Sequence, residues 1–157
     1  MRRLGLVVAL ACGTGCLAGE VQDRFASVVD AYTPAPFADA AQPYADPDRA
    51  LGPPDGRTVA LGQGSVLVLR FFRDIPDGRG PDLRVVEIGP DGAHASVAVS
   101  ADGTTFSEFP TPASAGATSE YDLSSTGLSK VSFVRIRGLD DQGLDPGFDL
   151  DAVEALH

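Results

Sequence analysis

The chain has 157 residues, of which 22 are acidic and 12 are basic, so its formal net charge is −10. This excess of negative charge repels phosphate backbones and argues against a nucleic acid partner. The length fits one domain, and both cysteines, Cys12 and Cys16, lie near the N-terminus, which excludes a disulfide scaffold in the rest of the chain.

The first predicted element is a short apolar leader. Arg2 and Arg3 precede an apolar run over residues 4–11, and small residues follow before Cys16. This order is typical of a secretory signal peptide, whereas a helix that spans a membrane needs about 20 apolar residues.

The end of this leader resembles a bacterial lipoprotein signal, with Cys16 as the acylated first residue and Cys12 as a rival. The alternative is an ordinary secreted or periplasmic protein. We expect residues 1–16 to be a signal peptide and residues 17–157 to form a single domain that is exported and anchored to the membrane by lipid.

Short apolar runs separated by turn residues fill the rest of the chain, which has 18 glycines and 12 prolines. Several runs alternate with period two: Ser132, Val134 and Ile136 share one strand face, while Arg135 and Arg137 belong to the other. We expect strands over residues 26–32, 65–72, 83–88, 96–100, 105–109, 119–123, 131–137 and 148–156. About eight such strands predict an all-β sandwich.

Two connections are distinctive. The proline-rich stretch over residues 34–56 reads as an irregular entry loop packed over one end of the sandwich. Asp102 and Gly103 lie between two strand-like runs, and this pair readily adopts the positive φ angles of a tight hairpin turn. We therefore predict a hairpin there.

Several stretches after Tyr44 together resemble the discoidin-like, or galactose-binding-like, jelly-roll modules of bacterial cell-surface proteins. They are residues 50–56 with 61–64, 78–87, 97–103, 134–137 and 147–156. The resemblance implies an eight-stranded jelly roll, frequently with a structural calcium ion, and a role in adhesion or glycan recognition.

Acidic residues gather in two places. One group lies on a turn rich in glycine and proline between two strands, and the other surrounds the entry to the last strand, where Asp140, Asp141 and Asp145 also lie. Calcium takes six to eight oxygen ligands, which irregular loops can supply. The ligands we predict for a noncontiguous calcium site are Asp74, Asp77, Asp82, Asp149, Asp151 and Glu154.

Alternation with period two also predicts that Asp149 and Asp151 share one side of their strand with Val153 and Ala155. Carboxylates at a buried edge need partners. Two alternatives to calcium remain open, namely plain solvent exposure and salt bridges from arginines such as Arg70, Arg73, Arg79 or Arg84.

The chain lacks a recognisable catalytic constellation. Its histidines are His94 and the terminal His157, and neither has neighbours in the sequence that suggest zinc or a triad. Tyr44 is the best aromatic candidate for ligand binding, with packing over the sandwich end as the alternative. Phe71 and Phe72 must point to opposite faces, so an exposed ring there would support a sugar ligand.

These observations predict an exported binding or adhesion module that is stabilised by calcium and has no catalytic activity. Its expected partners are the membrane, through the lipid anchor, and a glycan or an envelope protein. The alternatives are a structural protein of envelope assembly and an accessory carbohydrate-binding domain.

Overall fold

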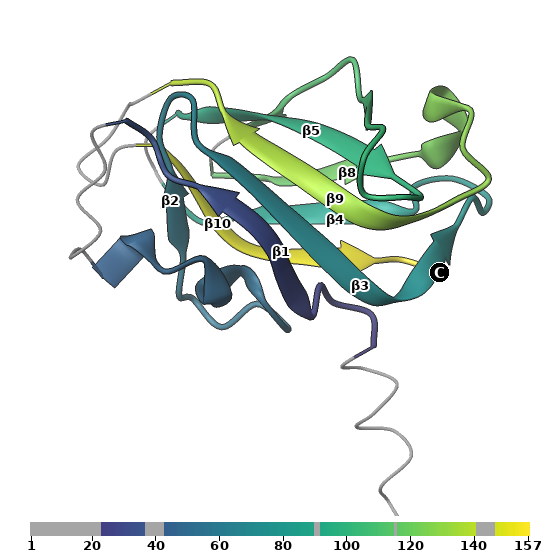
Figure 1. Cartoon of the computed structure of the whole chain (residues 1–157), viewed down its shortest axis with the longest axis horizontal. Coiled ribbons are helices and arrows are strands. Elements are labelled where there is room, and N and C mark those ends of the chain that lie inside the picture. Colours follow the sequence, from purple (N-terminus) through teal and green to yellow (C-terminus); the bar gives the residue numbers. More distant parts are fainter. Residues whose placement is uncertain (1–22, 37–42, 90–91, 115, 141–146) are drawn as a thin grey trace, which may run out of the picture.

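A computed structural model describes residues 23–36, 43–89, 92–114, 116–140 and 147–157, which form a sandwich of two antiparallel sheets (Figure 1). The strands are β1 (Val28–Thr33), β2 (Val59–Leu61), β3 (Val66–Pro76), β4 (Leu83–Glu87), β5 (His94–Ser100), β6 (Ser107–Glu108), β7 (Ala113–Ser114), β8 (Thr118–Tyr121), β9 (Lys130–Gly138) and β10 (Phe148–Ala155). Three 3-10 helices accompany them, η1 (Pro43–Ala45), η2 (Pro47–Ala50) and η3 (Leu123–Thr126).

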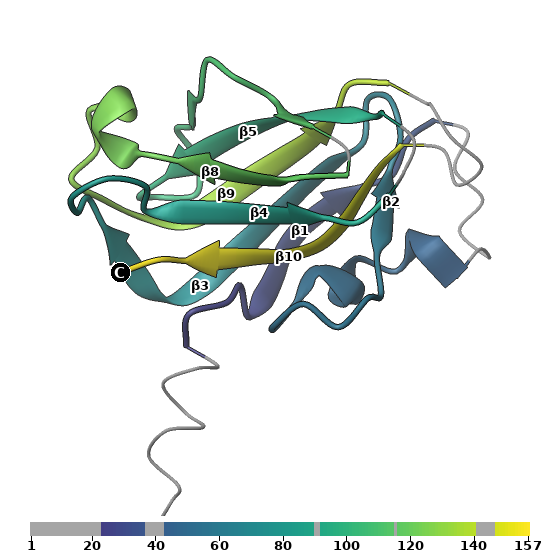
Figure 2. The same cartoon turned by 180° about the vertical axis from the view of Figure 1, so that it is seen from behind.

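The two sheets differ in size. The six-stranded sheet has the order β1-β3-β9-β5-β6, and β7 also pairs with β5. The four-stranded sheet has the order β2-β10-β4-β8, and Figure 2 shows β10 between β2 and β4. The predicted all-β sandwich is confirmed. The sequence did not reveal β2 and β7, because strands of three and two residues are too short for alternation to show.

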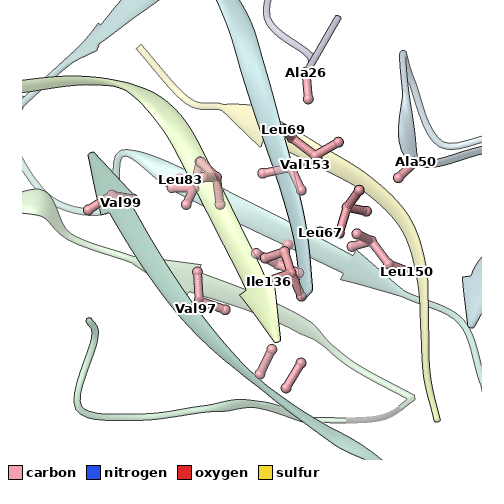
Figure 3. Close-up of a cluster of buried hydrophobic side chains, with 14 of the residues drawn as sticks. Ala26, Ala50, Leu67, Leu69, Leu83, Val97, Val99, Ile136, Leu150 and Val153 are labelled. Atoms are coloured by element: carbon pink, nitrogen blue, oxygen red, sulfur yellow. The ribbon is translucent and has the colours of Figure 1, made fainter. Parts of the chain in front are cut away.

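The core fills the space between the two sheets (Figure 3). Leu67 and Leu69 of β3 and Ile136 of β9 are fully buried on the inner face of the larger sheet, opposite Leu83 of β4 and Leu150 of β10. Each such side chain stabilises the fold by about 1.5–3 kcal/mol relative to leaving it in water. The core therefore holds the two layers together and fixes which strand faces point outwards.

Alternation along β3 separates two neighbouring aromatic rings. Phe71 is 4% exposed and belongs to the core, while Phe72 is 79% exposed. The prediction that they point to opposite faces is confirmed. Phe72 follows Arg70 on the outer face of the larger sheet, which no other layer of the described chain covers (Figure 1).

The prediction that Asp149 and Asp151 share one side of their strand with Val153 and Ala155 was wrong, because β10 contains an irregularity. Its pairing with β4 shifts register between Leu150 and Ala152. Leu150 faces the core before the shift and Val153 faces it afterwards, so Asp149 and Asp151 do not share the core-facing side with Val153. A bulge inserts one residue and reverses the alternation beyond it.

The predicted turn at Asp102 and Gly103 is longer than a two-residue hairpin. In β5, Val99 pairs with Ser107 of β6, so Thr105 precedes the second strand instead of belonging to it. The Asp102 carboxylate accepts hydrogen bonds from the backbone N–H groups of Thr104 and Thr105, each at 2.8 Å. These bonds, led by the one from Thr105, hold the pKa of Asp102 well below its ordinary value.

The described part of the entry loop contains η1 and η2, which lie against β2 at one end of the sandwich. Asp46 caps η2 by accepting a 3.1 Å hydrogen bond from the Asp48 N–H. Among the described residues, no helix combines the length and apolarity needed to cross a bilayer.

Candidate functional site

Asp82, one of the predicted metal ligands, is fully buried at the start of β4. Its Oδ1 accepts a hydrogen bond from the Gly78 N–H at 2.7 Å, and its Oδ2 accepts one from the Leu123 N–H at 2.8 Å. The Nε2 atom of His157 lies 3.6 Å from Oδ1. Asp82 thus joins the β3–β4 turn to η3, with both carboxylate oxygens occupied by donors.

A cluster of three carboxylates surrounds this position. Asp77, Asp82 and Asp122 each offer an oxygen, and the three oxygens lie within 4.8 Å of one another. The sequence grouped Asp77 with Asp82 but missed Asp122, which enters only because β8 pairs with β4. Hydrogen bonds from the Ser124 side chain and backbone N–H lower the pKa of Asp122. We refer to these three residues as the acidic turn cluster.

Asp149 lies in a different buried place, next to Glu87 at the far end of β4. A Cβ atom added at Gly89 would lie 2.6 Å from both Asp149 Oδ2 and Glu87 Oε1, so the two carboxylates flank this glycine. Glu87 Oε1 accepts a 2.7 Å hydrogen bond from the Gly89 N–H, and Oε2 accepts one from the Gly116 N–H. A side chain at position 89 would displace these groups.

Asp151 anchors the end of the entry loop to β10. It is 3% exposed, and its two carboxylate oxygens accept hydrogen bonds from the Asp55 N–H at 3.1 Å and the Gly56 N–H at 3.3 Å. Backbone N–H donors therefore satisfy this buried carboxylate.

The two remaining predicted ligands form ion pairs. Lys130 and Ser132 donate to the Asp74 carboxylate, and the Lys130 hydrogen bond is the main cause of a lowered pKa of Asp74. Glu154 accepts from Arg84 at 2.9 Å and lies 3.2 Å from Arg24. The salt-bridge alternative thus holds for Glu154.

The six predicted ligands do not converge on one ion, and this expectation is corrected. Asp82 precedes β4, whereas Asp149 lies beside Glu87 at the opposite end of the strand. At about 3.3 Å per residue, these ends are roughly 16 Å apart. Because β10 runs antiparallel to β4, the acids at its beginning are carried away from the β3–β4 turn.

The other candidate residues have simpler positions. Tyr44 is half-buried in η1, which lies against β2. His94 Nδ1 lies 3.3 Å from Asp140 Oδ2 at one end of β5. Cys16, Asp141 and Asp145 lie outside the described residues.

A groove of ≈ 460 Å³ lies between β8 and the segment that joins β6 to β7. Its apolar wall consists of Phe109, Pro110, Pro112, Ala117 and Tyr121. The rings of Phe109 and Tyr121 pack with their centroids 4.6 Å apart at an interplanar angle of 33°. Both rings are largely buried, so the two exposed prolines supply most of the apolar surface.

Polar side chains line the rest of this groove, namely Thr111, Ser114, Ser119, Glu120, Asp122 and Ser125. Glu120 is held by Arg84 at 2.8 Å. Burial raises the pKa of Tyr121 to about 12, and the nearby Ser119 side chain offsets part of that effect. The groove therefore combines a fixed apolar wall with hydroxyl and carboxylate groups, as small-ligand sites do.

No family model and no curated protein matches the sequence. Solved structures match the fold. A CBM32 module of AlyQ, solved in complex with 4,5-unsaturated mannuronic acid, has a TM-score of 0.54 at 14% identity and covers 84% of this chain and 98% of that chain. A pectin-binding carbohydrate-binding module has a TM-score of 0.58 at 11% identity, with 83% and 92% covered. CBM32-1 from a family 31 glycoside hydrolase of Clostridium perfringens has a TM-score of 0.54 at 12% identity, with 82% and 96% covered.

The chain has a discoidin-like jelly-roll fold. The resemblance expected from the sequence is thereby confirmed at the level of the fold. At 11–14% identity these structures do not identify which residues of this discoidin-like jelly roll bind a ligand. Its candidate sites are therefore those the geometry supplies, the groove beside Tyr121 and the acidic turn cluster.

Sequence reasoning missed the groove because its parts are far apart in the discoidin-like jelly roll. Phe109 belongs to the segment after β6, and Tyr121 ends β8. Neither residue lies in a motif. Phe109 is bonded to β5 in the larger sheet and Tyr121 lies in β8 of the smaller one, so the stacking of the two sheets brings the rings together. A weak signal was present in Pro110 and Pro112, which interrupt the strand pairing to β5.

Proposed function

We propose that this protein is a non-catalytic carbohydrate-binding module whose sugar site is the groove beside Tyr121. The observation that carries the proposal is a groove lined by two exposed prolines and two largely buried aromatic rings together with hydroxyl and carboxylate side chains. A sugar ring presents both an apolar face of C–H groups and hydroxyls that need hydrogen-bond partners, and such a groove offers both. Two proteins of similar fold, the AlyQ module in complex with 4,5-unsaturated mannuronic acid and the pectin-binding module, support the same class of ligand.

The groove supports binding better than catalysis. Its two carboxylates already have structural partners, since Arg84 holds Glu120 and the Ser124 N–H donates to Asp122 at 2.9 Å. Among the described residues that line it, none is a histidine or a cysteine. A hydrolytic site needs a free acid and base on opposite sides of a substrate, which this arrangement does not supply.

The test is a calorimetric titration with the oligosaccharides that bind on a glycan array. Ala117 is exposed in the groove, so Ala117→Trp fills it without disturbing the core. The matched control is Ala101→Trp, which adds the same ring to an exposed turn after β5. We expect Ala117→Trp to weaken binding by at least roughly tenfold, equivalent to about 1.4 kcal/mol, and Ala101→Trp to leave it unchanged. Equal binding by both variants, or no glycan bound by the protein, would refute the proposed site.

We also propose a calcium ion at the acidic turn cluster, a narrower site than the sequence suggested. Three carboxylates, two from the glycine-rich β3–β4 turn and one from the N-cap of η3, are ligands that calcium accepts. Asp82 already accepts two backbone hydrogen bonds, so Asp77 and Asp122 would supply most of the free oxygen lone pairs. Such a donor set favours a weak site that stabilises the turn.

Export and lipid attachment at Cys16 complete the proposal. Their support is the order of basic, apolar and small residues before that cysteine. Mass spectrometry of the N-terminus of protein purified from the membrane fraction separates the outcomes. Acylated Cys16 would support the anchor, and an unmodified new N-terminus would limit the proposal to export.

A further inference from the structure

We propose that the outer face of the six-stranded sheet binds an acidic polysaccharide through Arg135 and Arg137. The ligand class is a sugar polymer that carries carboxylate or sulfate groups. This surface lies on the opposite side of β9 from the core and does not include the groove, so the inference goes beyond the proposed function.

The two arginines stand side by side on β9. They are two residues apart on the outward side of the strand, which places them about 7 Å apart along it. Their strand neighbours are small or apolar: Val68 and Ala98 flank Arg135, and Val66 and Ser96 flank Arg137. Because these neighbouring side chains are short, the guanidinium groups project beyond them and are accessible to a ligand.

Neither arginine has an acidic partner among the described residues. Arg70, Arg73 and Arg84 each have a carboxylate within 4.0 Å, whereas no described carboxylate lies that close to Arg135 or Arg137. In a chain with 22 acidic and 12 basic residues, two adjacent positive charges without a carboxylate are conspicuous. An anion placed between them would relieve their mutual repulsion.

Arg135 is also held in place for binding. Its Cζ atom lies 4.6 Å from the centre of the Phe106 ring, an arrangement that attracts the cation to the ring face. Stacking on a ring leaves the in-plane N–H groups of a guanidinium available, and these can donate two parallel hydrogen bonds to a carboxylate or a sulfate. The Arg135 side chain is therefore already ordered before the ligand binds, which lowers the entropy cost of binding.

Aromatic surface on the same face favours a sugar polymer over a simple anion. Phe72 is 79% exposed on β3, on the same outward side as Arg70. Its ring can cover the apolar face of a sugar while the arginines hold the acidic groups. A nucleic acid is disfavoured because its phosphates lie closer together than one acidic group per sugar residue, so the protein's net charge of −10 repels it more strongly.

The experiment is native gel electrophoresis of the purified protein in gels that contain polygalacturonate, dextran sulfate or neutral dextran. The test variant is Arg135→Gln with Arg137→Gln. The matched control is Arg57→Gln with Arg79→Gln, which removes the same charge from two exposed arginines in separate turns. Circular dichroism establishes that both variants remain folded.

We expect the polyanions, and not neutral dextran, to retard the protein, with added salt weakening the effect. Losing both arginines should weaken the apparent affinity by roughly tenfold or more, because charge-assisted hydrogen bonds are the stronger kind. The control variant should bind like the parent. A preference between polygalacturonate and dextran sulfate shows whether carboxylate or sulfate is the preferred group.

Glu108 supplies a test of opposite sign. It is exposed, and it pairs across the strands with Ala98, which in turn pairs with Arg135. Removing its charge by Glu108→Gln should strengthen retardation, since the surface then repels the polyanion less. Equal behaviour of the test and control variants, equal retardation by neutral dextran, or no retardation would overturn the proposal. Ala117→Trp, which blocks the groove, should leave retardation intact, so the two sites can fail independently.

Discussion

The carboxylate of Asp82 accepts a 2.8 Å hydrogen bond from the backbone N–H of Leu123, a residue 41 positions further along the chain. The same carboxylate accepts a 2.7 Å bond from the Gly78 N–H. One buried side chain thereby fixes the β3–β4 turn against the 3-10 helix that follows β8. The acidic turn cluster and one rim of the groove depend on this connection, because Asp122 belongs to both.

Asp82→Asn should destabilise the protein strongly. An amide is the same size as a carboxylate, but its NH₂ group would face one of the two backbone N–H donors and leave it without an acceptor. We expect the free energy of unfolding to fall by about 2–4 kcal/mol, as measured by urea denaturation. Asp77→Asn, on an exposed neighbour, should change it by about 0.5 kcal/mol or less. Similar losses in both variants would show that the buried bonds contribute little.

Tyr121 should make the protein less stable at high pH. Burial raises its pKa from 10.0 to about 12, so the folded state keeps the neutral phenol where the unfolded chain has begun to lose its proton. The neutral Tyr121 phenol therefore makes its full contribution to the free energy of unfolding below pH 10, and this contribution is lost as the pH rises through about 12. It amounts to roughly 2–3 kcal/mol at most.

The measurement for Tyr121 is the free energy of unfolding as a function of alkaline pH. Tyr121→Phe keeps the ring packed against Phe109 and removes the ionisable group. We expect this variant to lose less stability than the parent between pH 10 and 12. Parallel curves for the two proteins would contradict the assigned shift.

Calcium should raise the melting temperature modestly through the acidic turn cluster. An ion that binds only the folded state, at ten times its dissociation constant, contributes about 1.4 kcal/mol, which corresponds to a rise of about 3–5 °C for a domain of this size. The comparison is calorimetry with millimolar calcium and with EDTA.

The variant for the calcium test combines Asp77→Asn and Asp122→Asn. Asparagine caps helices as well as aspartate does, so the cap of η3 is retained while two charges are lost. We expect the effect of calcium to disappear in this variant. If the parent melts at the same temperature in calcium and EDTA, the metal proposal is wrong.

The sequence by itself determined the class of fold and most of the strands. Alternation over residues 131–137 correctly separated Val134 and Ile136, which the structure buries, from Arg135 and Arg137 on the other face, because burial of one sheet face imposes a period of two. The same rule separated Phe71 from Phe72. These are local consequences of strand geometry, and a sequence records them directly.

Only the tertiary structure decided which acids meet. Asp82 and Asp149 belong to runs of acidic residues that resemble each other in the sequence, yet strand pairing sends them to opposite ends of β4. A bulge in β10 then reverses the faces that simple alternation predicts for Asp149 and Val153. Register shifts and strand order depend on contacts between distant segments, so no local pattern contains them, and the groove beside Tyr121 was hidden for the same reason.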